Sequence, residues 1–220
     1  MKLFLTSSTI TENLVDDFEI LIGRPIKGLK AAFIPDAADG APPENDKLWV
    51  AKERQVLIDW YNWKIADFVL KDSNVDDLQA LFDMDVIFVN GGFSGYLAKI
   101  MRNSGFEEIL PALLEKGIVY VGSSAGSMVM SDVQDASSWY LGGPEPEAIN
   151  IPGIGIIDFQ IYPHVKDSTV EAIKANCKPG FIYYLLPDGT AISIDGEYVR
   201  ENIKLCGEGI EVVERVNTKA

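Results

Sequence analysis

A short segment rich in glycine and serine, set between two apolar runs, constrains the fold of this chain more than any other feature. Residues 118–121 favour a strand and residues 125–130 suit a helix, so the Gly-x-Ser-x-Gly pattern at 122–126 predicts a sharp strand-to-helix turn. Glycine is expected at both ends of the turn because a Cβ there would meet the adjoining strand or helix. The turn would expose the Ser124 hydroxyl at a helix N-terminus, where negative charge is favoured. The alternative is a βα turn without chemistry.

Strand-like and helix-like segments alternate along the first 130 residues. We expect strands at 3–6, 30–35, 65–70, 86–89 and 118–121, and helices at 11–22, 46–60, 74–82, 96–101 and 106–114. The run at 86–89 is apolar throughout, as in a parallel strand buried on both faces. Such alternation predicts βαβ crossovers, and therefore an α/β fold with a three-layer α/β/α sandwich around a mostly parallel sheet.

Two helices carry further local signals. Thr9 and Glu12 fit a capping box for the first helix. The inward face of the second helix is expected to carry Trp49, Val56, Leu57 and Trp60. We also expect the aromatic cluster at 60–63 to pack on the core rather than to form an exposed patch for assembly.

The pattern changes after residue 150. Strands are expected at 158–162 and 181–186 around a helix at 168–175, followed by short antiparallel strands at 191–194, 198–200, 204–206 and 211–213. The Asp195-Gly196 pair is a strong signal for a hairpin turn. No linker or internal repeat interrupts the chain, so we expect a single domain over residues 1–220.

Composition excludes several classes of partner. The chain has 19 lysines and arginines against 33 acidic residues, a net charge of −14, which argues against nucleic acid and anionic membranes as partners. No apolar run approaches the roughly 18 residues of a membrane span, and the N-terminal apolar stretch is too short for a signal peptide. Two cysteines, Cys177 and Cys206, favour reduced thiols in a cytoplasmic protein over a single disulfide bridge.

A serine hydroxyl becomes an effective nucleophile when a neighbouring base accepts its proton. His164 is the only histidine in the chain. It follows a predicted strand, and would therefore lie at the carboxyl edge of a sheet, where the active sites of α/β proteins gather. We expect His164 to act as the base for Ser124; the alternative is a lone surface histidine.

The histidine of such a site is oriented by a carboxylate, and the sequence offers several. Asp188 follows a strongly apolar predicted strand and can reach the same edge, although its Asp-Gly pair is also common in β-turns. Asp132 and Asp135 follow the helix after the turn. Asp167 is near the histidine in sequence but is expected at a solvated helix start. The residues alone leave this choice open.

Hydrolysis at a serine also needs N–H donors for the tetrahedral oxyanion. One should be the backbone N–H of Ala125, directly after the serine. The other should come from the loop 90–94, in which two glycines follow a buried strand. One histidine and two distant cysteines match no zinc pattern, the acidic segment 36–46 lacks EF-hand spacing, and no phosphate-binding motif is present. We therefore expect neither a metal nor a cofactor.

Together these motifs resemble the peptidase E family of serine peptidases, the aspartyl dipeptidases, to which cyanophycinase is more distantly related. The resemblance covers nearly the whole chain and is carried by Ala32-Phe33-Ile34-Pro35, Val89-Asn90-Gly91-Gly92, Gly122-Ser123-Ser124-Ala125-Gly126, Gln160-Ile161-Tyr162-Pro163-His164 and Leu186-Pro187-Asp188-Gly189. It implies a fold like that of class I glutamine amidotransferases. It also implies that Ser124 is the nucleophile and His164 the base, with Gly92 and Ala125 as oxyanion donors, and it favours Asp188 as the third member.

The chain departs from the family pattern at several places. Members usually carry Gly-Gly-Gly-Asn-Thr where this chain has Phe93 in place of the asparagine, and Trp or Thr where it has Ser123. The family's Leu-Pro-Glu-Gly is shortened by one methylene at Asp188. Aspartyl dipeptidases bind the acidic substrate side chain with an arginine after the histidine, but this segment holds only Lys166 and Lys174.

The expected function is therefore a serine peptidase that hydrolyses short peptides, without an assured preference for aspartate. A hydrolase of another amide, isopeptide or ester is one alternative. A non-catalytic binding protein derived from a hydrolase is another, motivated by Phe93 and by the missing arginine. The expected partner is a small peptide, and either a monomer or a homodimer is compatible with the sequence.

Overall fold

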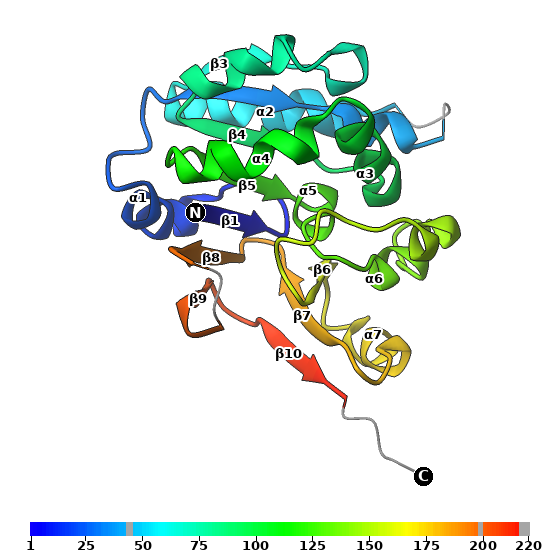
Figure 1. Cartoon of the computed structure of the whole chain (residues 1–220). Helices are drawn as coiled ribbons and strands as arrows, with labels where there is room; N and C mark the ends of the chain where they lie inside the picture. Colours follow the sequence, from blue (N-terminus) through cyan, green and yellow to red (C-terminus); the bar gives the residue numbers. More distant parts are fainter. Residues whose placement is uncertain (43–45, 198–199, 216–220) are drawn as a thin grey trace.

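A seven-stranded sheet forms the centre of the molecule in the computed structural model, which describes residues 1–42, 46–197 and 200–215 (Figure 1). Its strand order is β3-β2-β4-β5-β1-β8-β9. The bounds are β1 (Lys2–Thr6), β2 (Lys30–Ile34), β3 (Lys64–Asp67), β4 (Val86–Val89), β5 (Val119–Ser123), β8 (Ala191–Asp195) and β9 (Ile203–Cys206). The first five strands in that order are mutually parallel, while β8 and β9 extend the sheet in antiparallel fashion. The predicted α/β fold with a mostly parallel sheet is confirmed.

Helices cover both faces of this sheet (Figure 1). On one face, α1 (Val15–Ile22) and α2 (Leu48–Tyr61) pack in a cluster that includes Phe4 of β1. On the other, α3 (Ser94–Asn103) and α4 (Phe106–Glu115) join a cluster with the neighbouring strand residues Leu3 and Leu5. Because successive strand side chains point to opposite faces, apolar residues at every position of a strand supply both layers.

A second, three-stranded sheet lies beside the first, below β8 in Figure 1. Its order is β10-β7-β6, formed by β6 (Gln160–Val165), β7 (Ile182–Pro187) and β10 (Glu211–Glu214). The strands β6 and β7 are parallel, and β10 is antiparallel to β7. The remaining α-helices of the described residues are α5 (Ala125–Met128), α6 (Asp135–Ser138) and α7 (Val170–Asn176). In the same part of the chain, 3₁₀ turns span Glu12–Leu14, Asp36–Gly40, Leu70–Asp72, Asp77–Asp83, Pro146–Asn150 and Arg200–Asn202.

The predicted helix at 74–82 is wrong, because this segment forms a 3₁₀ turn at Asp77–Asp83. The side chain of Asn74 accepts the backbone N–H of Asp76 at 2.8 Å, and the Asp77 carboxylate accepts that of Asn74 at 2.9 Å. Such local bonds compete with an α-helix. The buried Leu78 and Leu81 lie on one side because residues three apart are aligned in a 3₁₀ helix.

Other local predictions also need correction. The first helix is divided into a 3₁₀ turn and α1, and the Thr9–Glu12 capping box is absent, since the N-cap residue is Thr11 and makes no capping bond. The strands on either side of the Asp195-Gly196 pair, β8 and β9, are antiparallel partners, as a hairpin requires. The connection is longer than two residues, since β9 begins only at Ile203 and the Gly196 N–H bonds to the Met1 carbonyl at 2.9 Å. The predicted strand at 198–200 lies outside the described residues at 198–199, and a 3₁₀ turn begins at Arg200.

The inward face predicted for α2 is only partly correct. Leu57 is buried, but the exposed fraction of Trp60 is 56% and that of Trp49 is 36%. Farther on, Tyr61 and Trp63 are buried against Phe18 and Phe88, so the aromatic cluster packs on the core except at Trp60. Helix α2 therefore packs on the sheet mainly through its C-terminal half, and most side chains of its first turns are exposed.

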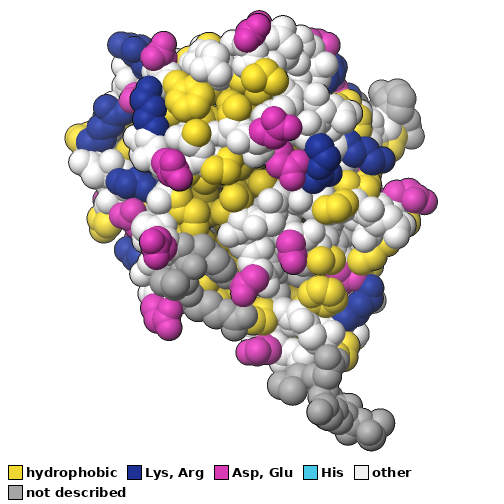
Figure 2. All heavy atoms as spheres, viewed as in Figure 1, with side chains coloured by type: hydrophobic (Ala, Val, Ile, Leu, Met, Phe, Trp, Pro, Cys, Tyr) yellow, Lys and Arg dark blue, Asp and Glu magenta, His cyan; other side chains and the backbone are white. Residues whose placement is uncertain are grey.

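The surface carries charges of both signs. On the face shown in Figure 2, acidic side chains are spread among lysines and arginines.

Both cysteines are buried and free, which excludes the alternative of a disulfide bridge. Among the helices of the described ranges, none combines the length and the apolar character needed to span a bilayer.

Close backbone contact at Gly126 holds α5 against β4. A Cβ at this position would lie 2.3 Å from the Val89 carbonyl oxygen. We expect Gly126→Ala to destabilise the fold by about 1–3 kcal/mol even though alanine favours helices, because the backbone of β4 cannot move away. Urea unfolding measures this. Gly117→Ala is the control, because that position has open space and bears only the cost of a positive φ of 90°. A Gly126→Ala protein at least as stable as Gly117→Ala would contradict the packing argument.

Candidate active site

The carboxyl ends of the parallel strands meet at one edge of the main sheet, and the predicted turn at Ser124 lies there. Ser124 has φ 50° and ψ −108° between β5 and α5, a conformation that non-glycine residues rarely adopt. A Cβ at Gly122 would lie 2.5 Å from the Gly126 carbonyl oxygen, so both glycines are required by close packing, as predicted. Helix α5 covers only Ala125–Met128, which is shorter than the predicted 125–130.

His164 approaches this turn from the second sheet. The pairing of β6 with β7 is irregular between Tyr162 and Val165, and His164 inside this irregularity has φ 57°. The bulge directs the imidazole towards the main sheet, where His164 Nε2 lies 3.0 Å from Ser124 Oγ. The structure therefore brings together the serine and the histidine that the sequence singled out.

Asp188 follows β7 and contacts the other side of the imidazole. Its Oδ1 lies 2.7 Å from His164 Nδ1, although 61% of the carboxylate side chain is exposed. The hydrogen bond from His164 holds the pKa of Asp188 below its usual range. Asp188 is therefore ionised at neutral pH and able to orient the imidazole.

Ser7, which the sequence analysis missed, forms hydrogen bonds with both His164 and Asp188. Its hydroxyl lies 3.0 Å from both Asp188 Oδ1 and the Leu186 carbonyl, and it accepts the backbone N–H of His164 at 2.8 Å. The residue directly follows β1, at the same edge as Ser124. The rule that strand ends converge there was the signal that could have found it.

The other candidate carboxylates lie elsewhere. Asp135 is fully buried and accepts hydrogen bonds from Trp139 Nε1 and Tyr183 Oη, both at 2.8 Å, and from the Lys178 ammonium. Asp132 and Asp167 are exposed. None of these three carboxylates bonds to His164 among the described contacts.

Two backbone N–H groups are available beside Ser124. Among the described residues, neither Gly92 nor Ala125 donates its N–H to a loop or turn acceptor. Gly92 has φ 150°, and a Cβ there would lie 2.1 Å from the Ala37 carbonyl oxygen, so only glycine fits. Phe93, the departure from the family pattern, donates its own N–H to Ala37 at 2.9 Å. Phe93 also lines a small cavity together with Ser124 and Met128.

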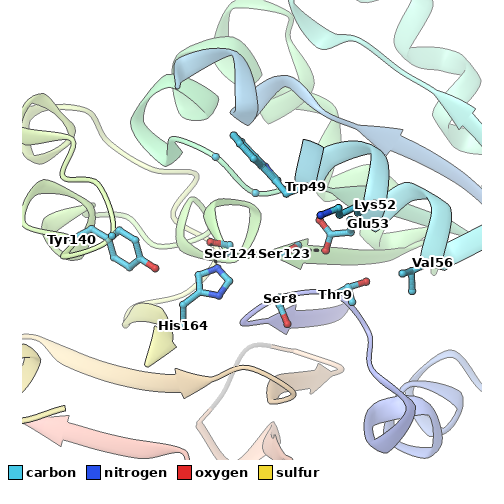
Figure 3. Close-up of a pocket in the computed structure, with 13 residues that line it drawn as sticks. Ser8, Thr9, Trp49, Lys52, Glu53, Val56, Ser123, Ser124, Tyr140 and His164 are labelled. Carbon is cyan, nitrogen blue, oxygen red and sulfur yellow. Dashed lines mark hydrogen bonds between the residues drawn. The ribbon is translucent and has the colours of Figure 1, made fainter. Parts of the chain in front are cut away.

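A pocket of about 530 Å³ opens beside Ser124 and His164 (Figure 3). Helix α2 supplies one wall, and Gly91 and Gly92, Ser8 and Thr9, and Tyr140 with Gly142 supply the others. The wall from α2 consists of Trp49, Lys52, Glu53 and Val56. Spacings of three and four residues place these side chains on one face of the helix, so the residues predicted to face the core partly face the pocket instead.

Glu53 is the second group that the sequence analysis missed. Its carboxylate accepts the Ser123 hydroxyl at 2.7 Å and the side-chain amide of Asn90. Burial raises the pKa of Glu53 to about 7, an effect only partly offset by the Ser123 hydrogen bond and by the nearby His164. Its position four residues after Trp49, on a face otherwise predicted to be apolar, was the signal in the sequence.

Cations near the pocket are few. Lys174 on α7 pairs with Glu171 at 3.2 Å and Glu211 at 2.6 Å, and Lys166 is exposed. Within the described ranges, Lys52 is the lysine or arginine that lines the pocket.

Asp39 of the acidic segment 36–46 pairs with Lys47 and Lys71. The described residues contain no cluster of three or more metal-ligating side chains.

Comparisons with known proteins show which family and which solved structures this chain resembles. The family model of peptidase family S51 matches residues 3–202. Peptidase E of Streptomyces coelicolor is 31% identical over 42% of this chain and 37% of its own length, and peptidase E of Citrobacter koseri is 26% identical over 58% and 56%. The matched segments therefore span only about a third to a half of these two curated relatives.

Solved structures share the fold over almost the whole chain. A candidate peptidase E protein from Listeria monocytogenes superposes with a TM-score of 0.69 at 20% identity, covering 97% of this chain and 98% of its own. A peptidase from an acI-B1 Actinobacterium gives a TM-score of 0.67 at 18% identity, covering 97% and 94%. These two similarities support the fold.

The buried contacts of Asp135 make it a structural residue. We expect Asp135→Ala to lower the free energy of unfolding by about 3 kcal/mol, because Tyr183 Oη and Trp139 Nε1 lose their acceptor. Thermal and urea unfolding measure the loss. Asp132→Ala, at an exposed carboxylate, is the matched control and should change stability by less than about 0.5 kcal/mol. Equal stabilities of the two variants would contradict this role.

The Glu53 carboxyl should make stability depend on pH. Its folded pKa of about 7 exceeds the ordinary 4.5, so the folded state binds the proton more tightly, and stability is lost as pH rises through this window. Glu53→Gln removes the charge, and its amide can donate to Ser123 and accept from Asn90. We expect it to be up to about 3 kcal/mol more stable than wild type at about pH 8, and not more stable at about pH 4. Urea unfolding at both pH values, with the exposed Glu115→Gln as control, tests the sign. An unchanged difference at the two pH values would refute it.

Proposed function

Because this chain belongs to peptidase family S51 and is a serine-type peptidase, we propose that it hydrolyses short peptides through Ser124, His164 and Asp188. The observation that carries the proposal is the continuous hydrogen-bonded path from Ser124 Oγ through the imidazole to Asp188, with links of 3.0 Å and 2.7 Å. These distances are within reach for proton transfer from a hydroxyl to an imidazole and for orientation of that imidazole by a carboxylate.

In the proposed reaction, Ser124 Oγ attacks the peptide carbonyl carbon while His164 Nε2 accepts the hydroxyl proton. The N–H groups of Gly92 and Ala125 donate to the oxyanion of the tetrahedral intermediate. His164 then gives its proton to the leaving amine, the C–N bond breaks, and an acyl-enzyme remains on Ser124. Water hydrolyses this ester with His164 again acting as the base, which restores the free serine.

The surroundings of the triad support small substrates without a preference for aspartate. The pocket beside Ser124 has a volume of about 530 Å³, which suits a few residues rather than a folded chain. Lys174, on the helix after His164, is already engaged by two carboxylates, and a lysine does not reproduce the planar bidentate contact of an arginine. A cytoplasmic location fits two free, buried thiols.

The reaction is tested with a library of dipeptides and tripeptides, analysed by mass spectrometry. We expect Ser124→Ala to lose turnover by at least about 10⁴-fold while it remains folded, because no other nucleophile replaces the hydroxyl. A fluorophosphonate should label wild type and not this variant. Full activity of Ser124→Ala would disprove the assignment. Turnover of esters or amides but not of peptides would move the activity to another carbonyl substrate.

Asp188 is tested separately from Ser124. We expect Asp188→Asn to lower kcat by at least about 10²-fold, because an asparagine does not hold the imidazole in the required tautomer or stabilise its protonated form. Asp132→Asn and Asp167→Asn are matched controls at exposed carboxylates, and each should retain wild-type kcat. If Asp132→Asn lost activity and Asp188→Asn kept it, the third member of the triad would have to be reassigned.

A further inference from the structure

We propose that Glu53 is a specificity-determining residue that binds a cationic group of the substrate, an ammonium or a guanidinium, in the pocket beside Ser124. This inference rests on the proposed function of that site. It assigns the pocket to substrates that carry a positive charge close to the bond that is cleaved, in contrast to the acidic side chain that an arginine would select.

Glu53 is placed to contact a substrate rather than to stabilise the fold. It projects from α2 into the pocket of about 530 Å³, next to Ser123 and Ser124 (Figure 3). Among the described residues, no other carboxylate lines this pocket. Glu145 lines the small cavity that Phe93 also lines, but its two oxygens already accept the N–H groups of Gly95 and Tyr96, each at 2.8 Å.

The Glu53 carboxylate is held rigidly by the segments that carry the reaction centre. Oε1 accepts from Ser123, the residue before Ser124, and Oε2 accepts from Asn90, which precedes the two glycines of the oxyanion loop. An ionised carboxylate offers about four lone-pair positions, so the bonds from Ser123 and Asn90, with the Thr9 hydroxyl as a third neighbour, still leave capacity for a further donor. A substrate cation bound there would have a fixed relation to the attacked carbonyl, as productive binding requires.

No lysine or arginine forms an ion pair with Glu53 in the part of the chain that the structure describes. The nearby His164 offsets the effect of burial only in part, so the pKa of Glu53 stays high. A buried carboxylate without a cation is costly to the fold, and sites of this kind are commonly functional. A substrate ammonium would supply the missing charge, and the aromatic ring of Trp49 on the same wall favours a cation as well (Figure 3).

Lys52 is the competing group, since it lines the same pocket with the opposite charge. Lys52 is exposed to solvent, whereas Glu53 is partly buried and held by hydrogen bonds from Ser123 and Asn90. A desolvated, oriented charge discriminates between ligands more strongly than a solvated one. Selection by Glu53 therefore favours cationic substrates, and selection by Lys52 would favour acidic ones.

The test compares peptides that differ only in charge, using the full-length protein. One pair has a free or an acetylated amino terminus, and a second pair has lysine or the uncharged norleucine before the cleaved bond. In wild type we expect the cationic member of at least one pair to have a kcat/KM about 10- to 100-fold higher, the range of a charge-assisted hydrogen bond. The pair that responds identifies the source of the charge.

The variants decide whether Glu53 is responsible. In Glu53→Gln, the ratio of kcat/KM between the cationic and the uncharged peptide of the responding pair should fall to about one, because KM for the cationic peptide rises. Lys52→Gln should keep the wild-type value of this ratio. Persistence of the cation preference in Glu53→Gln would overturn the proposal. So would a wild-type preference for neutral or acidic peptides that is lost in Lys52→Gln.

A binding measurement separates this inference from the catalytic one. Calorimetry with Ser124→Ala and the same peptides measures affinity without turnover, and Ser124→Ala/Glu53→Gln is the comparison. Weaker binding of the cationic peptide alone in the double variant supports the role of Glu53 even if wild type hydrolyses none of the peptides, which would refute only the proposed reaction. Equal affinity for charged and uncharged peptides would refute the role of Glu53.

Discussion

The end of β1 holds the backbone of both groups that face each other across the site. Ser124 and His164 each have a positive φ, which costs about 1–3 kcal/mol per non-glycine residue unless the surroundings impose it. Two consecutive residues impose it here: the Thr6 carbonyl accepts the N–H of Ser124 at 3.1 Å, and the Ser7 hydroxyl accepts that of His164 at 2.8 Å. Because Ser7 also contacts Asp188, a single strand end aligns groups carried by two different sheets.

The parts of the site that depend on backbone geometry could be predicted from the sequence. The glycines around Ser124 indicated a close approach of α5 to the sheet, and the alternation of elements placed Ser124 at a strand end. His164 was expected just after a strand at 158–162, but it lies inside β6, at the irregularity between Tyr162 and Val165. The choice of Asp188 depended on a family resemblance, because several carboxylates occupied equally suitable positions. Ser7 and Glu53 were missed because their roles depend on hydrogen bonds across 157 and 70 residues, and the local signals at these two positions do not specify such distant partners.

Periodicity was less reliable where side chains face a pocket. Trp49 and Val56 repeat with the spacing of a core-facing helix, yet they line the cavity beside Ser124, because an apolar wall has the same sequence pattern whether it meets a protein core or a ligand. The predicted helix at 74–82 was wrong for another reason. The side chains of Asn74 and Asp77 accept nearby backbone N–H groups, and these bonds compete with an α-helix at the start of the segment. The spacing of hydrophobic residues alone therefore separates neither a pocket wall from a core-facing helix nor a 3₁₀ turn from an α-helix.

The division of the site between two sheets has a consequence for synthesis of the protein. Ser124 and the loop 90–94 follow strands β5 and β4 of the main sheet, while His164 lies on β6 and Asp188 directly follows β7, later in the chain. A nascent chain therefore presents the proposed nucleophile well before the base that would activate it. Under the proposed mechanism, the serine would remain an ordinary alcohol until the later strands have left the ribosome and docked, so the growing chain would not hydrolyse the peptides that surround it.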